Sequence, residues 1–422
     1  MSDRKDVLVL GAGMAGVATA IHLLKRGCAV TLVDRRGPGE ETSFGNAGII
    51  QREGIHPYLF PRDLRSVVEV ALKLRTDADY QISSLPAVAP FLWRYFLASN
   101  RETARRTLAA NIPIFAHCLE AHQALMEEAG SSDLVAKRGW IRLFRNGDPI
   151  PEAEAEAREL RDLGLDAGMV SMEELASLEP DLDTTRLEGA LHYRDPWTCR
   201  DPGALVKSYA ALFEKLGGTF IRAEITGITR RAGKWVVTTN GPELSTELVA
   251  VTLGPWSKRL LDEAGLKLPM GVKRGYHQHF APSGNARLTR PVLDTEYGFV
   301  LAPMERGIRL TSGAEFARQD APKTPNQLRR ILPKARELFP LGDSVDEEPW
   351  LGARPVFPDM LPVIGEAPGM PGLWLHFGHA HHGFTLGPAT GQLTAQLMTG
   401  ETPYCDPAPY SALRFMRGQG GR

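Results

Sequence analysis

Residues 7–35 of this chain, VLVLGAGMAGVATAIHLLKRGCAVTLVDR, contain its most informative pattern. It reads as a buried strand, a glycine-rich turn, a helix and a second strand that ends in an acid. In such a unit Gly11 permits the tight turn, Gly13 lets the backbone approach a pyrophosphate, and Gly16 lets helix and strand pack closely. The N-terminus of the helix then points at the phosphates. The pattern predicts a βαβ unit that binds a dinucleotide.

Asp34 favours a dinucleotide whose adenosine ribose has a free 2′-hydroxyl. It follows the glycines at the spacing where a carboxylate accepts hydrogen bonds from a ribose 2′-hydroxyl and repels a 2′-phosphate. NAD and FAD share the ADP half, so this unit alone leaves the choice between them open. The residues expected to contact the cofactor here are Gly11, Ala12, Gly13, Met14, Ala15, Gly16 and Asp34.

The loop after the second strand, RRGPGEETSFGNAG at residues 35–48, has four glycines, two small hydroxyl residues and few apolar side chains. Its free N–H groups and hydroxyls suit a second phosphate or a ring edge. By composition alone, a mobile surface loop remains the alternative. The candidate cofactor contacts in this loop are Arg35, Ser43, Asn46, Ala47 and Gly48.

Several motifs in a fixed order resemble one family. They are the glycine-rich unit, ETSFGNAGII at 41–50, LGPWS at 253–257, GARPVFPDMLPVIG at 352–365 and FGHAHHGFTLGP at 377–388. Together they resemble the flavin-dependent D-amino-acid oxidase superfamily, and most closely its bacterial D-amino-acid dehydrogenases. The resemblance implies FAD rather than NAD, bound between a nucleotide domain and a sheet-rich substrate domain.

The fold class that the resemblance implies is α/β. We expect a Rossmann-like FAD-binding domain of the D-amino-acid oxidase type, with an interleaved α+β substrate domain built on an antiparallel sheet. The FAD-binding domain is expected at 1–56, 203–264 and 346–422, and the substrate domain at 57–202 and 265–345.

Local patterns predict individual elements. Helices are predicted at 101–130, 152–164, 205–216 and 392–398, and short β-rich runs at 140–144, 190–193, 276–280, 298–301 and 308–311. Short runs of this kind, broken by proline and glycine, are typical of an antiparallel sheet.

The composition is that of an ordinary globular enzyme. The chain has 422 residues, 43% of them hydrophobic, with 49 basic against 50 acidic side chains, so nothing indicates nucleic acid. Four scattered cysteines predict no metal site and no disulfide framework, and therefore a reducing compartment. Residues 1–6 leave no room for a signal peptide before the first strand, so we expect a cytoplasmic protein.

Arg354 is the strongest candidate for a substrate contact. Flavin amine oxidation must hold the carbon next to the amine at the flavin, and the carboxylate of a small amino-acid substrate is best bound by a guanidinium. The resemblance places Arg354 at the position of the arginine that anchors this carboxylate. The alternative is a surface arginine paired with Glu347, Glu348 or Asp359.

The second carboxyl-terminal motif contains three histidines, His379, His381 and His382. No acid or cysteine adjoins them, so a metal site is not predicted. The resemblance implies instead that a helix begins here and that its N–H groups face the flavin N1 and O2 and stabilise negative charge there. His379 and His381 are candidates for the substrate pocket, although a plain loop position is equally compatible. The expected cofactor contacts are Gly378, Gly383, Phe384, Thr385 and Leu386.

Two tyrosines and three other residues complete the candidate site. The phenol of Tyr297, or less favourably that of Tyr276, would bind the carboxylate beside Arg354, whereas both would otherwise be core aromatics. No general base is assigned, because water or a pocket histidine suffices to take the amine proton. The remaining expected cofactor contacts are Ile225, Gly254 and Trp256.

Residues 82–97 form the most apolar segment, with two prolines and one arginine, and they are too few to span a bilayer. Their aromatic residues suit a peripheral position at the inner face of the plasma membrane, as expected of an enzyme that reduces quinone. Burial against the substrate domain is an equally good interpretation.

The electron acceptor follows only from the resemblance, which favours a dehydrogenase that passes electrons to quinone or another carrier. No cysteine lies between Cys199 and Cys405, so we expect FAD to be bound non-covalently. The predicted reaction is oxidative deamination of D-amino acids to 2-oxo acids. The alternatives are oxidation of a secondary amine of the D-hydroxyproline, sarcosine or glycine type, and a flavoprotein subunit without its own turnover.

Overall fold

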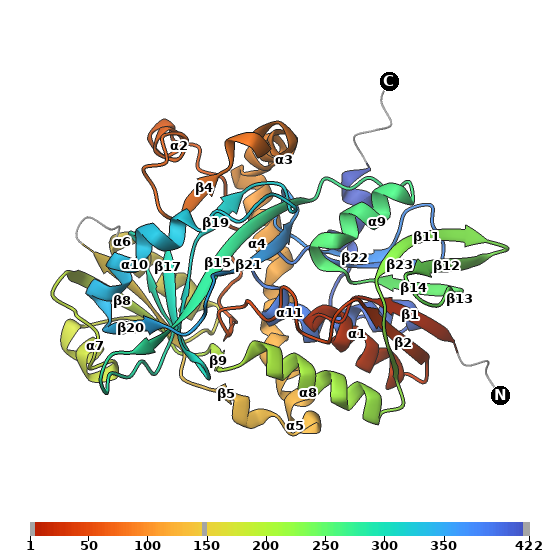
Figure 1. Cartoon of the computed structure of the whole chain (residues 1–422), viewed down its shortest axis with the longest axis horizontal. Coiled ribbons are helices and arrows are strands. Elements are labelled where there is room, and N and C mark those ends of the chain that lie inside the picture. The colour runs from red at the N-terminus through yellow and green to blue at the C-terminus, as the bar shows by residue number, and fades with distance from the viewer. Residues whose placement is uncertain (1–4, 146–149, 417–422) are drawn as a thin grey trace.

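The computed structural model describes residues 5–145 and 150–416. A six-stranded sheet and an eleven-stranded sheet form its two ends, and helices pack around and between them (Figure 1). This arrangement agrees with the predicted α/β class, in which a Rossmann-like sheet is combined with a second, largely antiparallel one.

The six-stranded sheet contains the glycine-rich unit. Five of its strands are parallel, and the edge strand β22 runs antiparallel to β23. Apolar side chains cover both faces, as expected for parallel strands between layers of helices. In spatial order the strands are β10 (Thr219–Arg222), β2 (Ala29–Asp34), β1 (Asp6–Leu10), β14 (Leu248–Val251), β23 (Leu373–Phe377) and β22 (Val363–Glu366).

The eleven-stranded sheet is mostly antiparallel, and its long strand β15 (Gly271–Pro282) pairs with β18, β19, β20 and β21. The run predicted at 276–280 is therefore the second half of a twelve-residue strand. The other strands are β4 (Ala78–Tyr80), β6 (Trp140–Arg145), β7 (Ala167–Val170), β8 (Leu187–Tyr193), β16 (Val292–Asp294), β17 (Phe299–Met304), β18 (Gly307–Thr311), β19 (Ala314–Phe316), β20 (Leu341–Ser344) and β21 (Trp350–Val356).

Strand β21 lies within residues 346–422, the segment expected to complete the FAD-binding domain, yet it pairs with β15 of the large sheet. Two three-stranded sheets complete the β structure. One has β11 (Ile225–Arg231), β12 (Lys234–Thr239) and β13 (Leu244–Thr246), and the other has β3 (Ile49–Ile50), β9 (Trp197–Cys199) and β5 (Val135–Ala136).

The helices cover the sheets and separate them. They are α1 (Met14–Leu24), α2 (Leu64–Ala71), α3 (Leu85–Ala98), α4 (Arg101–Ala116), α5 (Cys118–Ala129), α6 (Ile150–Asp162), α7 (Met172–Leu178), α8 (Pro202–Lys215), α9 (Ser257–Glu263), α10 (Asn326–Leu338) and α11 (Gly383–Thr399). Short 3₁₀ helices lie at Ile82–Ser84, Ser132–Leu134, Gly254–Trp256, Ala408–Tyr410 and Ala412–Phe415. Within the described ranges, no helix is both long and apolar enough to span a membrane.

Two predicted helices need correction. The single helix predicted over 101–130 is two helices, α4 and α5, which meet at His117. Pro113 lies in the last turn of α4, and because proline has no N–H and clashes with the preceding turn, it disfavours a continuous helix there. The helix predicted at 392–398 begins much earlier, at Gly383, because its first turns are rich in glycine and proline and give little helical signal.

Candidate active site

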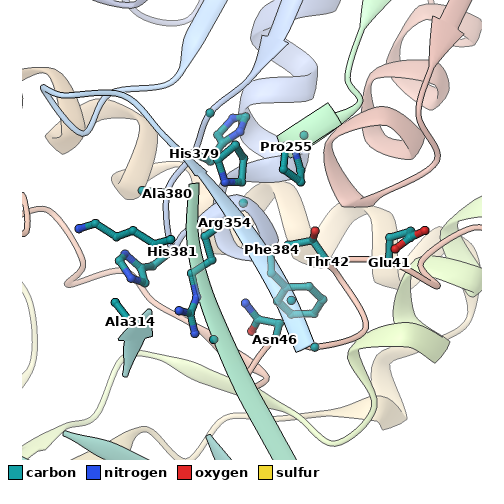
Figure 2. Close-up of a pocket in the computed structure, with 18 of the residues that line it drawn as sticks. Glu41, Thr42, Asn46, Pro255, Ala314, Arg354, His379, Ala380, His381 and Phe384 are labelled. Atoms are coloured by element: carbon teal, nitrogen blue, oxygen red, sulfur yellow. The ribbon is translucent and has the colours of Figure 1, made fainter. Parts of the chain in front are cut away.

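A cavity of about 990 Å³ joins the two halves of the molecule. It extends from Asp34, at the end of β2, to Arg354 on β21. Figure 2 shows Glu41, Thr42 and Pro255 on one side of this space and Arg354, His381 and Ala314 on the other. A cavity between the carboxyl ends of a parallel sheet and a second sheet is where dinucleotide cofactors bind.

The glycine-rich turn leaves no room for side chains. Gly11 has a φ of +111°, and a Cβ on Gly16 would lie 1.8 Å from the Gly11 carbonyl oxygen. Gly16 therefore lets α1 pack against the turn, as predicted. Gly13 is the N-cap of α1 and makes no side-chain hydrogen bond, so the N–H groups that follow Met14 in the first turn are available to an anion.

Asp34 is held at the cavity by two backbone groups. Its carboxylate accepts hydrogen bonds from the N–H groups of Ala12, at 2.7 Å, and Arg36, at 3.0 Å. Burial raises the pKa of Asp34 above its ordinary value, and the two backbone hydrogen bonds oppose that shift. Each carboxylate oxygen keeps capacity for a further donor, such as a ribose hydroxyl.

The loop that carries Ser43 and Asn46 is held by hydrogen bonds to the N-terminus of α1, within the loop itself, and to Arg309. The Ser43 hydroxyl accepts a hydrogen bond from the N–H of Met14 at 3.0 Å, and the Asn46 side chain accepts one from the N–H of Gly48 at 2.8 Å. The buried guanidinium of Arg309 donates to the carbonyls of Phe44, at 3.0 Å, and Asn46. These hydrogen bonds hold the loop at the cavity, as expected of a cofactor-binding loop, and Arg309 is a supporting residue that sequence patterns did not indicate.

Helices α1 and α11 approach each other closely through glycine. A Cβ on Gly387 would lie 2.5 Å from the Met14 Cγ, and one on Gly391 would lie 2.8 Å from the Thr19 nitrogen. Because these two helices pack so tightly, both of their N-terminal ends face the same cavity, which Met14, Gly383 and Phe384 line. The structure thus offers two positive helix ends to one ligand.

Arg354 has no acidic partner within the residues that the structure describes. Its guanidinium makes one long hydrogen bond, 3.4 Å, to the carbonyl of Gly313, and burial lowers its pKa to about 10. Asp359 pairs instead with Arg414 at 2.7 Å, and Glu348 lies 3.7 Å from Lys323. The surface-pairing interpretation of Arg354 is therefore wrong, and the guanidinium faces the cavity with donors to spare (Figure 2).

The phenol near Arg354 belongs to Tyr58, which the sequence did not indicate. Tyr58 lines the cavity, interacts electrostatically with Arg354, and places its ring 4.8 Å from that of His381. It lies in an irregular segment, residues 51–63, that contains no recognisable motif.

The two tyrosines singled out from sequence have other roles in this geometry. Tyr297 is not among the described residues that line the cavity, and its ring packs under the side chains of Arg145 and Lys334. Tyr276 lines the cavity, but its hydroxyl is held by Glu315, at 3.1 Å, and by the N–H of Thr324. Tyr297 falls outside the site because it precedes β17 in a turn, where strand alternation does not fix the direction of a side chain.

The three histidines differ in their surroundings. His379 is bonded to the Thr390 hydroxyl at 3.1 Å, and burial lowers its pKa to about 3. The Nδ1 atoms of His381 and His382 are buried without a hydrogen-bond partner in the described structure. Burial, followed by the charge of Arg354, lowers the pKa of His381 well below its ordinary value, so this ring is neutral at pH 7.

The histidine loop is under backbone strain. Ala380, between His379 and His381, has a φ of +52°, which is uncommon for a residue with a side chain. The N–H of Ala380 donates to the carbonyl of Pro355 at 3.0 Å, next to Arg354. Strain of this kind persists only where surrounding structure enforces it, and it clusters at functional sites.

Most of the other predicted residues lie where expected. Those that line the cavity are Gly11, Gly13, Met14, Ala15, Asp34, Arg35, Ser43, Asn46, Ala47, Ile225, Gly254, Trp256, Gly378, Gly383 and Phe384. Arg35 stacks over the Trp256 ring at 4.5 Å. Five others sit behind the surface and shape it, namely Ala12, Gly16, Gly48, Thr385 and Leu386.

The apolar segment 82–97 is divided between two environments. Leu85, Leu92 and Tyr95 of α3 line the cavity, whereas Trp93 is 61% exposed and Leu97 is 50% exposed. Neither of the two interpretations offered from sequence describes the whole helix.

The cavity combines the N-termini of two helices with the Asp34 carboxylate and a glycine-rich turn. Sites of this class bind an adenine dinucleotide. The family model described as "FAD dependent oxidoreductase" matches residues 6–397. The chain belongs to this family, and its cofactor is FAD, as predicted. The residues present fit FAD, because one continuous cavity is lined by the Asp34 carboxylate and by the N-terminal ends of α1 and α11.

Two relatives match almost end to end. A "D-amino-acid oxidase" of Bradyrhizobium diazoefficiens is 29% identical over 99% of this chain and all of its own length. A "D-amino acid dehydrogenase" of Chromohalobacter salexigens is 29% identical over 97% of this chain and 99% of its own.

Solved structures share the fold. Glycine oxidase from Geobacillus kaustophilus superposes with a TM-score of 0.74 at 22% identity, covering 97% of this chain and 98% of its own. L-proline dehydrogenase from P. horikoshii gives a TM-score of 0.76 at 20% identity, covering 99% of each chain.

Proposed function

We propose that this FAD-dependent oxidoreductase is a dehydrogenase that deaminates D-amino acids to 2-oxo acids and passes the electrons to quinone or another carrier. The observation that carries the proposal is the Arg354 guanidinium, which faces the cofactor cavity without a carboxylate partner in the described structure. The relatives named for D-amino-acid oxidation, which match over nearly the full length of both chains, support the choice of substrate.

FAD, when bound, accepts a hydride equivalent from the carbon next to the amine. The protein's own contribution is to hold and orient the substrate. Arg354 binds the α-carboxylate through parallel N–H donors, and the Tyr58 phenol beside it adds a hydrogen bond. The imino acid that forms is hydrolysed by water to the 2-oxo acid and ammonia.

His381 is the group best placed to interact with the amine. His381 lines the cavity and its ring is neutral, so a ring nitrogen that faces the cavity can accept a hydrogen bond from the substrate nitrogen. His379 acts differently, because its bond to Thr390 fixes the loop that carries His381. We assign His379 a positioning role and His381 a substrate contact.

Non-covalent binding of FAD is part of the proposal. Of the described residues that line the cavity, none is a cysteine, and burial raises the pKa of Cys199 to about 12, which makes that thiol a poor nucleophile. We also propose the division into an FAD-binding domain and a substrate domain that the sequence indicates, with β21 connecting the two.

The surface formed by α2 and α3 is proposed to contact the membrane that holds the quinone. Both helices line the cavity on one side and carry exposed apolar residues on the other. The exposed apolar residues are Leu64 and Val68 of α2, Trp93 and Leu97 of α3, and Leu72 and Ile82 in the segment between the two helices, with exposed fractions from 44% to 77%. Such a patch suits an interface that buries apolar side chains just below the headgroups.

Two experiments test these proposals. Anaerobic addition of D-amino acids to the purified holoenzyme is expected to bleach the flavin, whereas failure with every D-, L- and N-alkyl amino acid would contradict the enzymatic role. Activity that stays with membranes after a high-salt wash, and is released by Trp93→Ser with Leu97→Ser, supports the membrane surface. Activity wholly in the wash would rule it out.

A further inference from the structure

Lys273 is a second buried cation at the substrate end of the cavity. It lies on β15 directly opposite Arg354 on β21, and opposed residues of antiparallel strands project from the same face of the sheet. Lys273 lines the same cavity as Arg354 and is only 4% exposed. The two side chains are near enough for the charge of Arg354 to disfavour protonation of Lys273.

The partners of Lys273 are aromatic. Its Nζ donates to the Tyr95 hydroxyl at 3.0 Å and lies 4.4 Å from the centre of the same ring. The Tyr95 hydroxyl donates in turn to the carbonyl of Tyr58, so Lys273 meets a lone pair. No acidic side chain forms an ion pair with Lys273 in the part of the chain that the structure describes, and the one charge that shifts its pKa is that of Arg354. Two of its three donors remain available.

Burying a charged lysine in this position costs folding free energy unless an anion binds beside it. Burial and the neighbouring guanidinium lower the pKa of Lys273 to about 7. An apolar residue of similar length would fill the same space without that penalty. An anion that enters the cavity would therefore stabilise the protonated form of Lys273, which no acidic residue of the described structure does.

The two basic side chains at this end of the cavity, Arg354 and Lys273, suit a substrate with two negative charges. To lose a hydride equivalent, the substrate amine must be neutral, so an amino acid with an uncharged side chain presents only its carboxylate. Arg354 alone balances that charge. A second carboxylate on the substrate would stabilise the protonated form of Lys273 in the same way.

We propose that the substrate is an amino acid with a second carboxylate, and that Lys273 and the Tyr95 hydroxyl bind this group while Arg354 binds the α-carboxylate. The inference rests on the proposed function for the use of Arg354, but the two-cation site itself can be tested without turnover.

The first test measures binding. Succinate and butyrate have the same number of carbons but two carboxylates against one, and both are titrated into the holoenzyme by the change in flavin absorbance. We expect succinate to bind at least about 10-fold more tightly, as one added charged hydrogen bond provides. Lys273→Met should remove the difference, and Lys273→Arg should keep part of it. Lys323→Met, at a 54% exposed lysine, is the matched control.

The second test measures turnover with isosteric pairs. D-glutamate against D-glutamine, and D-aspartate against D-asparagine, differ mainly in the charge of the side chain. The wild type should favour the acids in kcat/KM, and Lys273→Met should lose this preference because its kcat/KM falls further for the acids than for the amides. Flavin content and thermal midpoint of the variant show whether it is folded.

Each contrary result has a definite meaning. A wild type with a higher kcat/KM for the amides than for the acids overturns the proposal. So does a Lys273→Met variant whose kcat/KM falls equally for acids and amides, because Lys273 would then act on the α-carboxylate or the amine. If succinate is preferred but no amino acid is oxidised, the two-cation site stands and the proposed function fails.

Discussion

The Arg354 guanidinium lies directly over the Cα of Gly275 on the neighbouring strand, and a Cβ built on Gly275 would be 2.6 Å from the Arg354 Nη1. Gly275 has no unusual φ, so its role is space rather than backbone conformation. The carboxylate-binding position of Arg354 therefore depends on a missing side chain one strand away.

Gly275→Ala is expected to displace the guanidinium and raise KM for amino acids by about 10-fold or more, because a misplaced anchor loses its aligned hydrogen bonds. FAD content should stay at the wild-type level. Steady-state kinetics with the best D-amino acid provide the measurement. Gly227→Ala, where a Cβ has nothing within 4 Å, is the control. An unchanged KM in Gly275→Ala would contradict the geometry.

Arg354→Ala should raise KM on the order of 100-fold, since a charged bidentate contact is lost, and Arg354→Lys should be intermediate because lysine cannot bind bidentately. Both variants should retain FAD. Arg186→Ala, at an arginine that is 65% exposed, serves as the control. Normal kinetics in Arg354→Ala would exclude the arginine from substrate binding.

Asp34→Ala is expected to weaken FAD binding about 10- to 100-fold, because the ribose hydroxyls lose a charged acceptor and the N–H of Ala12 loses its partner. Asp34→Asn keeps one acceptor oxygen and should fall between that variant and the wild type. The ratio of flavin to protein after dialysis measures the effect. Full retention of FAD by Asp34→Ala would mean that the carboxylate does not bind the cofactor.

The outcome for individual residues shows what sequence can predict. Gly11, Gly16 and Asp34 act within one short unit, where spacing along the chain determines spacing in the structure. Arg354 was recognisable because it lies in a motif that resembles a family.

Residues that depend on distant pairing were not recognisable. Lys273 lies beside Arg354 only because β15 pairs with β21. Tyr58 reaches the site only because an irregular segment passes the histidine loop. Tyr297 was assigned to the site from its place near a strand, but its side chain packs elsewhere. Sequence gives the period of a strand but not the direction of a residue in the turn beside it.

Stability should fall as pH decreases from 7 to 5. Burial lowers the folded-state pKa of His22, His122, His192, His277, His279, His376, His379, His381 and His382 below the ordinary value of 6.5. The unfolded chain therefore binds more protons in this window, and unfolding becomes easier as pH falls. A fully shifted histidine contributes at most about 2 kcal/mol between pH 6.5 and 5.

Glu53 opposes this trend, because burial raises its pKa to about 7 and it is protonated in the folded state first. Burial also raises the pKa of Asp34 and Asp294, but these three carboxyl groups are fewer than the nine histidines, so the thermal midpoint should still drop toward pH 5. Differential scanning calorimetry from pH 5 to 8 provides the measurement. A midpoint that is constant or rises toward pH 5 would contradict the buried, neutral state of these histidines.

Acid precipitation should separate FAD from the protein, leaving a colourless pellet and a yellow supernatant, because no thiol lies in the described lining of the cavity. Absorbance of the two fractions at the flavin band is the measurement. Colour that remains with the pellet would show a covalent link and would require a nucleophile other than a cavity cysteine.

Oxidation of D-amino acids by this enzyme is best tested by anaerobic reduction of the bound flavin with paired enantiomers of one amino acid, in the wild type and in Arg354→Ala. We expect rapid bleaching of the wild-type flavin by the D-enantiomer, little by the L-enantiomer, and a shift to much higher D-enantiomer concentrations in the variant. Bleaching by both enantiomers alike, or bleaching that does not depend on Arg354, would contradict this expectation.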